Sequence, residues 1–192
     1  MTKAWEKARK VLAAGGVVAV PTDTVWGLVA RIDRPEAIRR LYALKGRPGE
    51  KPFQLLIADL AAARRLVAPA YHPGLGKLAM RFWPGPLTVV VPAARELGPA
   101  LTPAGKVGLR LPESAPLRAL IKEGGGVLIG TSANKSGAPP VQSEAEARAL
   151  GADLVIPGQA WGQASTVFDL KDRRLLRPGP ITLEELLSAL SD

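Results

Sequence analysis

The sequence predicts an α/β (α+β) fold, a single compact domain over residues 1–192 with a mixed β-sheet flanked by helices. Short apolar runs typical of buried strands are interleaved with segments of helical periodicity along the chain, which is the pattern of α/β and α+β proteins. A length of 192 residues corresponds to one domain by default. Hydrophobic residues make up 47% of the chain and charged residues 22%, which is typical of a globular protein with a real core.

The first half of the chain is expected to begin with a helix over residues 3–14. Trp5, Ala8 and Leu12 recur there at helical spacing, and two glycines follow as a stop signal. Pro35 suits the first turn of a second helix, because its missing N–H is not needed there. Further elements expected in this half are helices at 36–44 and 73–82, a helix capped by Asp59, and strands at 17–20, 53–57 and 87–91.

The second half of the chain contains two capping boxes, in which a hydroxyl and a carboxylate each satisfy a free backbone N–H at a helix start. Ser143 with Glu146 and Thr182 with Glu185 both fit the S/T-x-x-E pattern. They predict helices at 144–150 and 183–190. The other expected elements are a helix at 115–122 and strands at 107–111, 127–130, 154–156, 166–170 and 175–176, the last two as a hairpin.

The residue counts exclude several classes of chemistry. The chain has no Cys and one His, which excludes disulfide scaffolds, zinc fingers, thiol nucleophiles and His-rich metal sites. His72 has no partner motif, so we expect a structural or surface role for it. No apolar run approaches the ~20 residues that span a bilayer, and the N-terminus lacks the apolar core of a signal peptide. We therefore expect a cytoplasmic protein with no membrane partner.

Hydroxyl side chains gather in three short segments, 21–28, 131–137 and 165–167, which hold seven of the fifteen Ser and Thr residues. The first two segments directly follow apolar strands, where ligands of α/β proteins tend to bind. The only Asn of the chain, Asn134, lies in the second segment. Since Ser, Asn and Gly also favour turns, ordinary turn chemistry is an equal alternative.

Basic residues form a second group of candidates. Lys45 and Arg47 lie on a loop between a helix and a strand, where they could bracket phosphate oxygens or form an ordinary solvated loop. Arg110 lies inside an apolar strand, on the face opposite Leu109, and needs an anionic partner. That partner is either a ligand or an internal carboxylate. Arg177 has a similar status.

Motifs for nucleotide phosphates are absent from the sequence. There is no Walker A sequence, no G-x-G-x-x-G after a strand, and no acidic cluster for a metal. Phosphate chemistry would therefore rely on Lys, Arg, hydroxyl and backbone N–H groups. The formal net charge of +9 also favours polyanionic partners.

Seven segments occur in the order of a known family, and the similarity that they anchor extends from about residue 8 to 188. They are PTDTVWGL from Pro21, KGRP from Lys45, WPGPLT from Trp83, GLRLP from Gly108, TSAN from Thr131, STV from Ser165 and LRPG from Leu176. In these segments the chain resembles the YrdC-like threonylcarbamoyl-AMP synthases, in the short form of the family. One departure is Trp26, where the family usually has Tyr. A tryptophan offers no hydroxyl contact there but can still have a stacking or packing role.

The resemblance implies a twisted mixed sheet with a positive, concave active-site surface. It implies that L-threonine, bicarbonate or CO2, and ATP with Mg²⁺ on its phosphates are condensed to threonylcarbamoyl-AMP and pyrophosphate. The product then serves tRNA threonylcarbamoyladenosine formation through a transferase. The implied catalytic residues are Lys45 and Arg47, with no metal ligands. The implied ATP contacts are Lys45, Arg47, Ser132, Asn134, Ser136 and Arg177, with Lys51 as a weaker candidate, and the implied threonine contacts are Thr22, Arg110, Thr131 and Ser165.

Two other functions remain open at this point. An RNA-binding, ribosome-assembly or translation factor would use the +9 charge, and binding of tRNA or double-stranded RNA could also accompany the enzyme activity. Few aromatic residues are available for stacking on bases, however, with four Trp, two Tyr and three Phe. The other alternative is a carbamoyl-phosphate enzyme like the YrdC-like module of hydrogenase maturation proteins, which is joined to Cys-rich zinc segments that this chain lacks.

Overall fold

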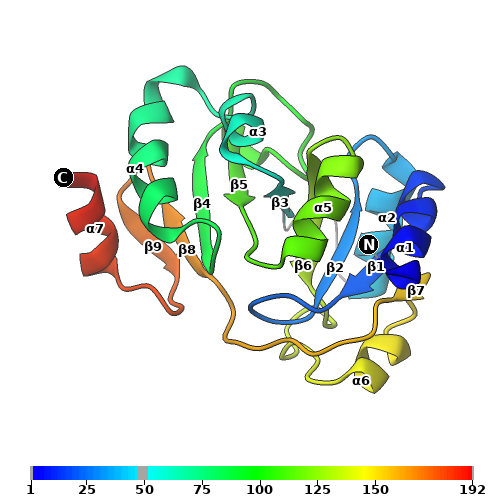
Figure 1. The fold of residues 1–192 in the computed structure, drawn as a ribbon. Helices are drawn as coiled ribbons and strands as arrows, with labels where there is room; N and C mark the ends of the chain where they lie inside the picture. Colours follow the sequence, from blue (N-terminus) through cyan, green and yellow to red (C-terminus); the bar gives the residue numbers. More distant parts are fainter. Residues whose placement is uncertain (1, 47–51, 192) are drawn as a thin grey trace.

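A computed structural model describes residues 2–46 and 52–191, and within them nine strands form one mixed sheet (Figure 1). The strand order is β7-β1-β2-β6-β3-β5-β4-β8-β9. The pairs β1–β7, β3–β5 and β4–β8 are parallel, and the other neighbours are antiparallel. The strands are β1 (Val18–Val20), β2 (Gly27–Arg31), β3 (Gln54–Ile57), β4 (Leu87–Pro92), β5 (Lys106–Arg110), β6 (Val127–Ser132), β7 (Leu154–Val155), β8 (Thr166–Asp169) and β9 (Arg174–Arg177).

The helices connect these strands and cover the sheet. Figure 1 shows α1 beside α5 at one end of the sheet and α4 beside α7 at the other. The helices are α1 (Lys3–Ala13), α2 (Pro35–Lys45), α3 (Leu60–Arg64), α4 (His72–Phe82), α5 (Ala115–Glu123), α6 (Glu144–Ala149) and α7 (Leu183–Ser191), with 3-10 turns at Pro69–Tyr71 and Pro103–Gly105. None of the described helices is long and apolar enough to cross a membrane.

Alternation along the strands divides the core into two clusters. On β3, Leu55 and Ile57 pack into the larger cluster with side chains of α2, α3, α4 and α7, while Leu56 packs into the smaller one under α1 and α5. Because successive side chains point to opposite faces, Gln54 shares the face of Leu56. On that face α1 and α5 cover β1, β2, β6 and the Leu56 end of β3, and the rest of the face is left for a site.

The predicted elements are found close to their expected positions. The side chain of Asp59 accepts the N–H of Ala62 (2.7 Å), so it caps α3 as expected. Ser143 accepts from Glu146 N (3.2 Å) at the start of α6. At the start of α7, Thr182 Oγ1 accepts from Glu185 N (3.2 Å), and Glu185 Oε2 accepts from Thr182 N (2.8 Å). The turn after β8 forms the expected hairpin with β9.

The strand β2 was not predicted, because its residues were assigned to the end of a polar loop and to the segment that follows it. From Gly27 to Ala30 every residue is buried, so the segment lacks the apolar–polar alternation that identifies a half-exposed strand. It pairs with β1 on one side and with β6 on the other. The first polar segment is therefore the hairpin loop between β1 and β2.

Candidate active site

A cavity of about 880 Å³ lies on the uncovered half of the sheet. Its floor is formed by alternate residues of the central strands, among them Gln54, Gly108, Val90 and Val167. Among the described lining residues, five are cationic and one, Asp169, is a carboxylate. The cationic residues are Lys45, Lys106, Arg110, Arg174 and Arg177. The cavity therefore has the charge of a binding site for anions.

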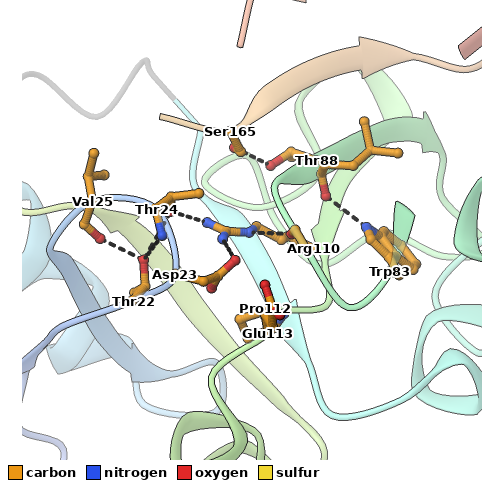
Figure 2. A network of polar contacts seen from close by, with 12 residues as sticks. Thr22, Asp23, Thr24, Val25, Trp83, Thr88, Arg110, Pro112, Glu113 and Ser165 are labelled. Atoms are coloured by element: carbon orange, nitrogen blue, oxygen red, sulfur yellow. Dashed lines mark hydrogen bonds and ion pairs between the residues drawn. The ribbon is translucent and has the colours of Figure 1, made fainter. Parts of the chain in front are cut away.

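Arg110, the last residue of β5, points from the floor toward the β1–β2 loop. Its Nη1 donates to Thr24 Oγ1 (2.6 Å), and its Nε donates to Gly85 O (3.1 Å). Its Nη2 forms an ion pair with Asp23 Oδ2 (2.6 Å), as Figure 2 shows. Burial lowers the pKa of Arg110, although Asp23 opposes that shift. The internal carboxylate, one of the two alternatives for Arg110, is therefore present.

The β1–β2 loop is held by its own hydroxyl groups. Thr22 Oγ1 donates to Val25 O (2.7 Å) and accepts from Thr24 N (3.0 Å). Thr22 does not line the cavity but a recess of about 30 Å³ beside it, which also includes Thr24, Arg110 and Gln54. The turn chemistry expected as an alternative is thus real at Thr22, and the same loop also borders the site.

A second polar group lies on the opposite wall, around Ser165. Arg177 donates to Ser165 O through Nε (3.1 Å) and Nη2 (2.9 Å), and to Ser165 Oγ (3.0 Å). Ser165 Oγ bonds Thr88 Oγ1 (2.9 Å), a contact drawn in Figure 2. Burial lowers the pKa of Arg177, and the positive charge of Arg110 lowers it further. Two guanidinium groups therefore face one region of the cavity.

Lys45 provides the third cation, at the C-terminus of α2. Its side chain is buried, and Nζ donates to Ser132 O (2.7 Å) and Asn134 Oδ1 (2.5 Å). Ser132 Oγ also donates to Asn134 Oδ1 (2.6 Å), while Asn134 Nδ2 donates to Ala138 O (2.6 Å). The loop after β6 and the end of α2 thus form one structure.

The cavity brings together most of the predicted site residues. Those that line it are Lys45, Arg110, Thr131, Ser132, Asn134, Ser136, Ser165 and Arg177. Thr22 lines the adjoining recess. Arg47 and Lys51 lie outside the described residues. Among the described residues, no cluster of three or more His, Cys, Asp or Glu side chains could hold a metal.

Sequence reasoning did not single out three polar residues of the site, namely Asp23, Thr88 and Gln54. Asp23 neutralises Arg110, and Thr88 Oγ1 donates to Gln54 Oε1 (2.8 Å). Each stands in an ordinary loop or strand context, and the contacts join residues 34 or more positions apart. The one available signal was a polar Gln opening an apolar strand.

Two other residues have the structural roles that were expected. His72 Nε2 lies 3.0 Å from both Arg64 O and Val67 O, away from the cavity. Trp26 is fully buried, and its Nε1 has no hydrogen-bond partner among the described residues. Its role is therefore packing.

The fold and the site define a class of protein in which a mixed sheet carries a cavity lined by buried Arg and Lys side chains. A family model named Sua5_yciO_yrdC and described as telomere recombination matches residues 10–179. The chain therefore belongs to the Sua5/YciO/YrdC family, and the family resemblance of its sequence motifs is confirmed.

Curated relatives support this membership over most of the chain. A threonylcarbamoyl-AMP synthase of Chromobacterium violaceum is 36% identical over 177 residues, which cover 90% of this chain and 91% of the relative. A threonylcarbamoyl-AMP synthase of Bacillus subtilis is 39% identical over 191 residues, 94% of this chain. The chain spans 54% of that longer relative.

Solved structures agree with the fold. Pyrococcus abyssi Sua5, crystallised with L-threonine, has a TM-score of 0.86 and 33% identity, and the match covers 96% of this chain and 56% of that protein. E. coli YciO has a TM-score of 0.81 at 22% identity, over 95% of this chain and 92% of that one. The expected fold class is therefore confirmed.

Proposed function

We propose that this chain condenses L-threonine, bicarbonate or CO2, and ATP to threonylcarbamoyl-AMP and pyrophosphate. The observation that carries this proposal is the charge of the cavity, whose described lining has five cationic side chains and one carboxylate. That carboxylate, Asp169, already pairs with Lys106 Nζ (2.7 Å). Another of the five cations, Arg110, is paired with Asp23 beside the cavity. The excess positive charge suits two anionic reactants held side by side, and the curated relatives carry the name of this activity.

The substrates are assigned to two parts of the cavity. Threonine lies at the end formed by Arg110, Thr131 and Ser165, with Thr22 in the adjoining recess. The ATP phosphates are assigned to the end formed by Lys45, Ser132, Asn134 and Ser136, and Arg47 is kept as an ATP contact on the sequence motif alone. Arg177 was expected to contact ATP, and its bonds to Ser165 support a contact with threonine as well.

The reaction requires positioning more than acid–base chemistry. Bicarbonate takes up a proton and loses water to give CO2. The threonine amine attacks the carbon of CO2: an N–C bond forms, the electron pair of one C=O π bond moves to oxygen, and the amine loses a proton to solvent, which leaves a carbamate anion. A carbamate oxygen then attacks the α-phosphorus of ATP, and pyrophosphate leaves with the electrons of the broken P–O bond. Because the carbamate is already anionic, no histidine base is needed. Fixed cations stabilise the charge that develops during the transfer.

Mg²⁺ enters this proposal as part of the substrate. No described cluster of His, Cys, Asp or Glu could hold a resident metal, and the cavity's one carboxylate is paired with Lys106. ATP brings its own phosphate oxygens as ligands. We propose that Mg²⁺ enters on these phosphates, and that the cytoplasmic product passes to the machinery that forms threonylcarbamoyladenosine on tRNA.

Pyrophosphate release with each component omitted tests the function directly. We expect release from ATP to require both L-threonine and bicarbonate, measured in CO2-depleted buffer. ATP alone should be nearly inert. Serine should react more slowly, because one missing methyl contact reduces the rate by roughly 10- to 200-fold at most.

Two outcomes would contradict the proposal. Undiminished release without threonine would indicate a nucleotide hydrolase. No release under any condition, together with tight RNA binding, would favour the RNA-binding alternative.

A further inference from the structure

A chain of hydrogen bonds crosses the floor of the cavity from Arg177 to Gln54. We propose that the side-chain amide of Gln54 is a substrate-binding donor, and that its Nε2 receives an anionic oxygen of the threonine carbamate. This inference rests on the proposed function and adds a residue to its site.

Gln54 has a glycine beside it on each of the two neighbouring strands. Its partner across the antiparallel pair with β6 is Gly130. On the β5 side its neighbour is Gly108, where an added Cβ would lie 3.6 Å from Gln54 Cβ. No side chain therefore rises beside Gln54 from either neighbouring strand at this level, and its amide has free space above the floor.

The direction of every proton in the chain follows from Arg177, which can only donate. Its Nη2 donates to Ser165 Oγ (3.0 Å). The one hydroxyl proton of Thr88 is given to Gln54 Oε1 (2.8 Å). The bond between Ser165 and Thr88 (2.9 Å) must therefore use the proton of Ser165. All three bonds run the same way, from the guanidinium to the carbonyl oxygen of Gln54.

The common direction of these hydrogen bonds determines which atom of the Gln54 side-chain amide is left without a partner. Oε1 is held by Thr88, so Nε2 carries the two donors that remain. Nε2 has no hydrogen-bond partner within the described residues, and it is not among their buried unpartnered atoms, Asp23 Oδ1 and Trp26 Nε1. A donor in this state is accessible and unsatisfied, so it suits an acceptor supplied by a ligand.

The position of Gln54 indicates which substrate it receives. Gln54 lines both the cavity and the recess, and the recess also includes Thr22, Thr24 and Arg110. The hydrogen-bond chain passes through Ser165, which is assigned to the same threonine end. An amide donor beside Arg110 can bind a carboxylate or carbamate oxygen without adding a further charge. We therefore assign Gln54 to the acyl substrate and not to the ATP phosphates.

Gln54→Glu tests this assignment, since it keeps an acceptor for Thr88 but replaces the donor by a second acceptor. We expect the KM for threonine to rise about 10- to 100-fold, as expected when a hydrogen bond to a charged group is lost. The KM for ATP should change less than threefold. Gln54→Met, which has neither donor nor charge, should raise the threonine KM by a smaller factor. Gln159→Glu, on an exposed loop outside the cavity, controls for the added charge.

An unchanged threonine KM in both Gln54 variants would overturn the inference, as would a rise confined to ATP. If the unmodified chain shows no threonine-dependent release of pyrophosphate, the proposed function has failed instead. The two failures are thus distinguishable, because the second is seen before any variant is made.

Thr88 acts here as a positioning residue, and Thr88→Val removes its hydroxyl. We expect a rise in the threonine KM of several-fold with a smaller change in kcat, since Gln54 loses its fixed orientation. The double variant Thr88→Val/Gln54→Met should be no worse than Gln54→Met alone, because both changes act through one amide. Additive effects would mean that Thr88 acts on the substrate by another route.

Discussion

Lys45 is the most completely buried cation of the cavity, and its contacts explain how a lysine can be kept there. Its side chain is 2% exposed, and Nζ is bonded to a main-chain carbonyl and to the amide oxygen of Asn134. These contacts hold the ammonium group of Lys45 against the loop after β6. A charge at a buried position is screened less by solvent, so it acts more strongly on an anion that enters the cavity.

Lys45→Ala is expected to lower kcat/KM for pyrophosphate release by about 100- to 1000-fold, the usual effect of removing one fixed donor to a developing charge. Arg47→Ala is expected to act in the same direction, as the sequence predicts. Lys135→Ala is the matched control, because Lys135 bonds Leu44 O beside Lys45 but does not line the cavity. Near-normal turnover in both Lys45 and Arg47 variants would remove this loop from the reaction.

Arg110→Ala is expected to raise the requirement for threonine more than that for ATP, measured as the two KM values. The variant also leaves Asp23 as an unpaired buried carboxylate, which costs about 3–5 kcal/mol in proteins generally. Arg110→Ala/Asp23→Ala removes both charges, so a folded protein should be recovered. If the double variant has the native threonine KM, Arg110 is only the structural partner of Asp23.

The same residues show what sequence reasoning could find at the site. Lys45, Ser132 and Asn134 lie in short polar segments, where hydroxyl and basic residues stand out from an Ala- and Leu-rich background. Gln54 and Thr88 do not stand out, because each is a single polar residue in a strand. Their relation appears only when β3, β4 and the segment before β8 are brought together.

At the scale of elements, helices were predicted more fully than strands because their ends carry chemical signals. Asp59, Ser143 and Thr182 mark the starts of α3, α6 and α7, and each accepts a backbone N–H there. The strand β2 has no such marker, and its four buried residues follow a loop rich in polar groups. Its place between β1 and β6 is decided by tertiary pairing.

Thr182→Ala tests the contribution of one cap to the fold. The helix α7 packs on α4, and its Leu186 is fully buried in the core. Loss of the cap should lower the free energy of unfolding by about 1 kcal/mol, measured by urea denaturation. Ser188→Ala, at an exposed position of the same helix, should change it by less than about 0.5 kcal/mol. Equal effects would show that the Thr182 box does not stabilise the helix.

Asp153, just before the edge strand β7, connects this strand to β1 and α2, and its ionised form should make the stability of the fold depend on pH at acid pH. Its carboxylate accepts Val17 N (2.8 Å) before β1 and is paired with Arg40 of α2 (2.7 Å). Burial alone would raise the pKa of Asp153, but the bonds from Arg40 and Val17 outweigh it, so the pKa lies below its ordinary value.

A lowered pKa in the folded state means that the ionised form stabilises the fold. This stabilisation is complete above the pKa of the unfolded chain, about 4, and is lost as the pH falls through the lower folded value. Asp153→Asn should therefore be less stable than the native chain at pH 7, and the difference should shrink below about pH 4. Thermal unfolding at several pH values measures it, and a difference that is constant with pH would contradict the assignment.

For the whole molecule, the basic residues behind the net charge of +9 are partly buried and partly exposed, and salt screens these two groups to different extents. Arg110 and Lys45 are 4% and 2% exposed, whereas Arg9, Arg40 and Arg148 have side chains 45% or more exposed. Exposed charges are screened at a Debye length of about 8 Å at physiological salt, and buried ones much less. The surface charge therefore governs nonspecific attraction, and the buried charge governs substrate binding.

Salt separates these two parts in an experiment on the unmodified chain. Any affinity for RNA should fall steeply between 50 and 200 mM salt, with a slope of about −0.7 to −0.9 in log–log form for each phosphate neutralised. Threonine-dependent release of pyrophosphate at saturating ATP should fall by less than about threefold over the same range, because two of its cations, Lys45 and Arg110, are shielded from solvent. Filter binding and a pyrophosphate assay in the same buffers give both curves. A parallel decline of the two would mean that exposed residues hold the substrates and that the buried cations of the cavity do not.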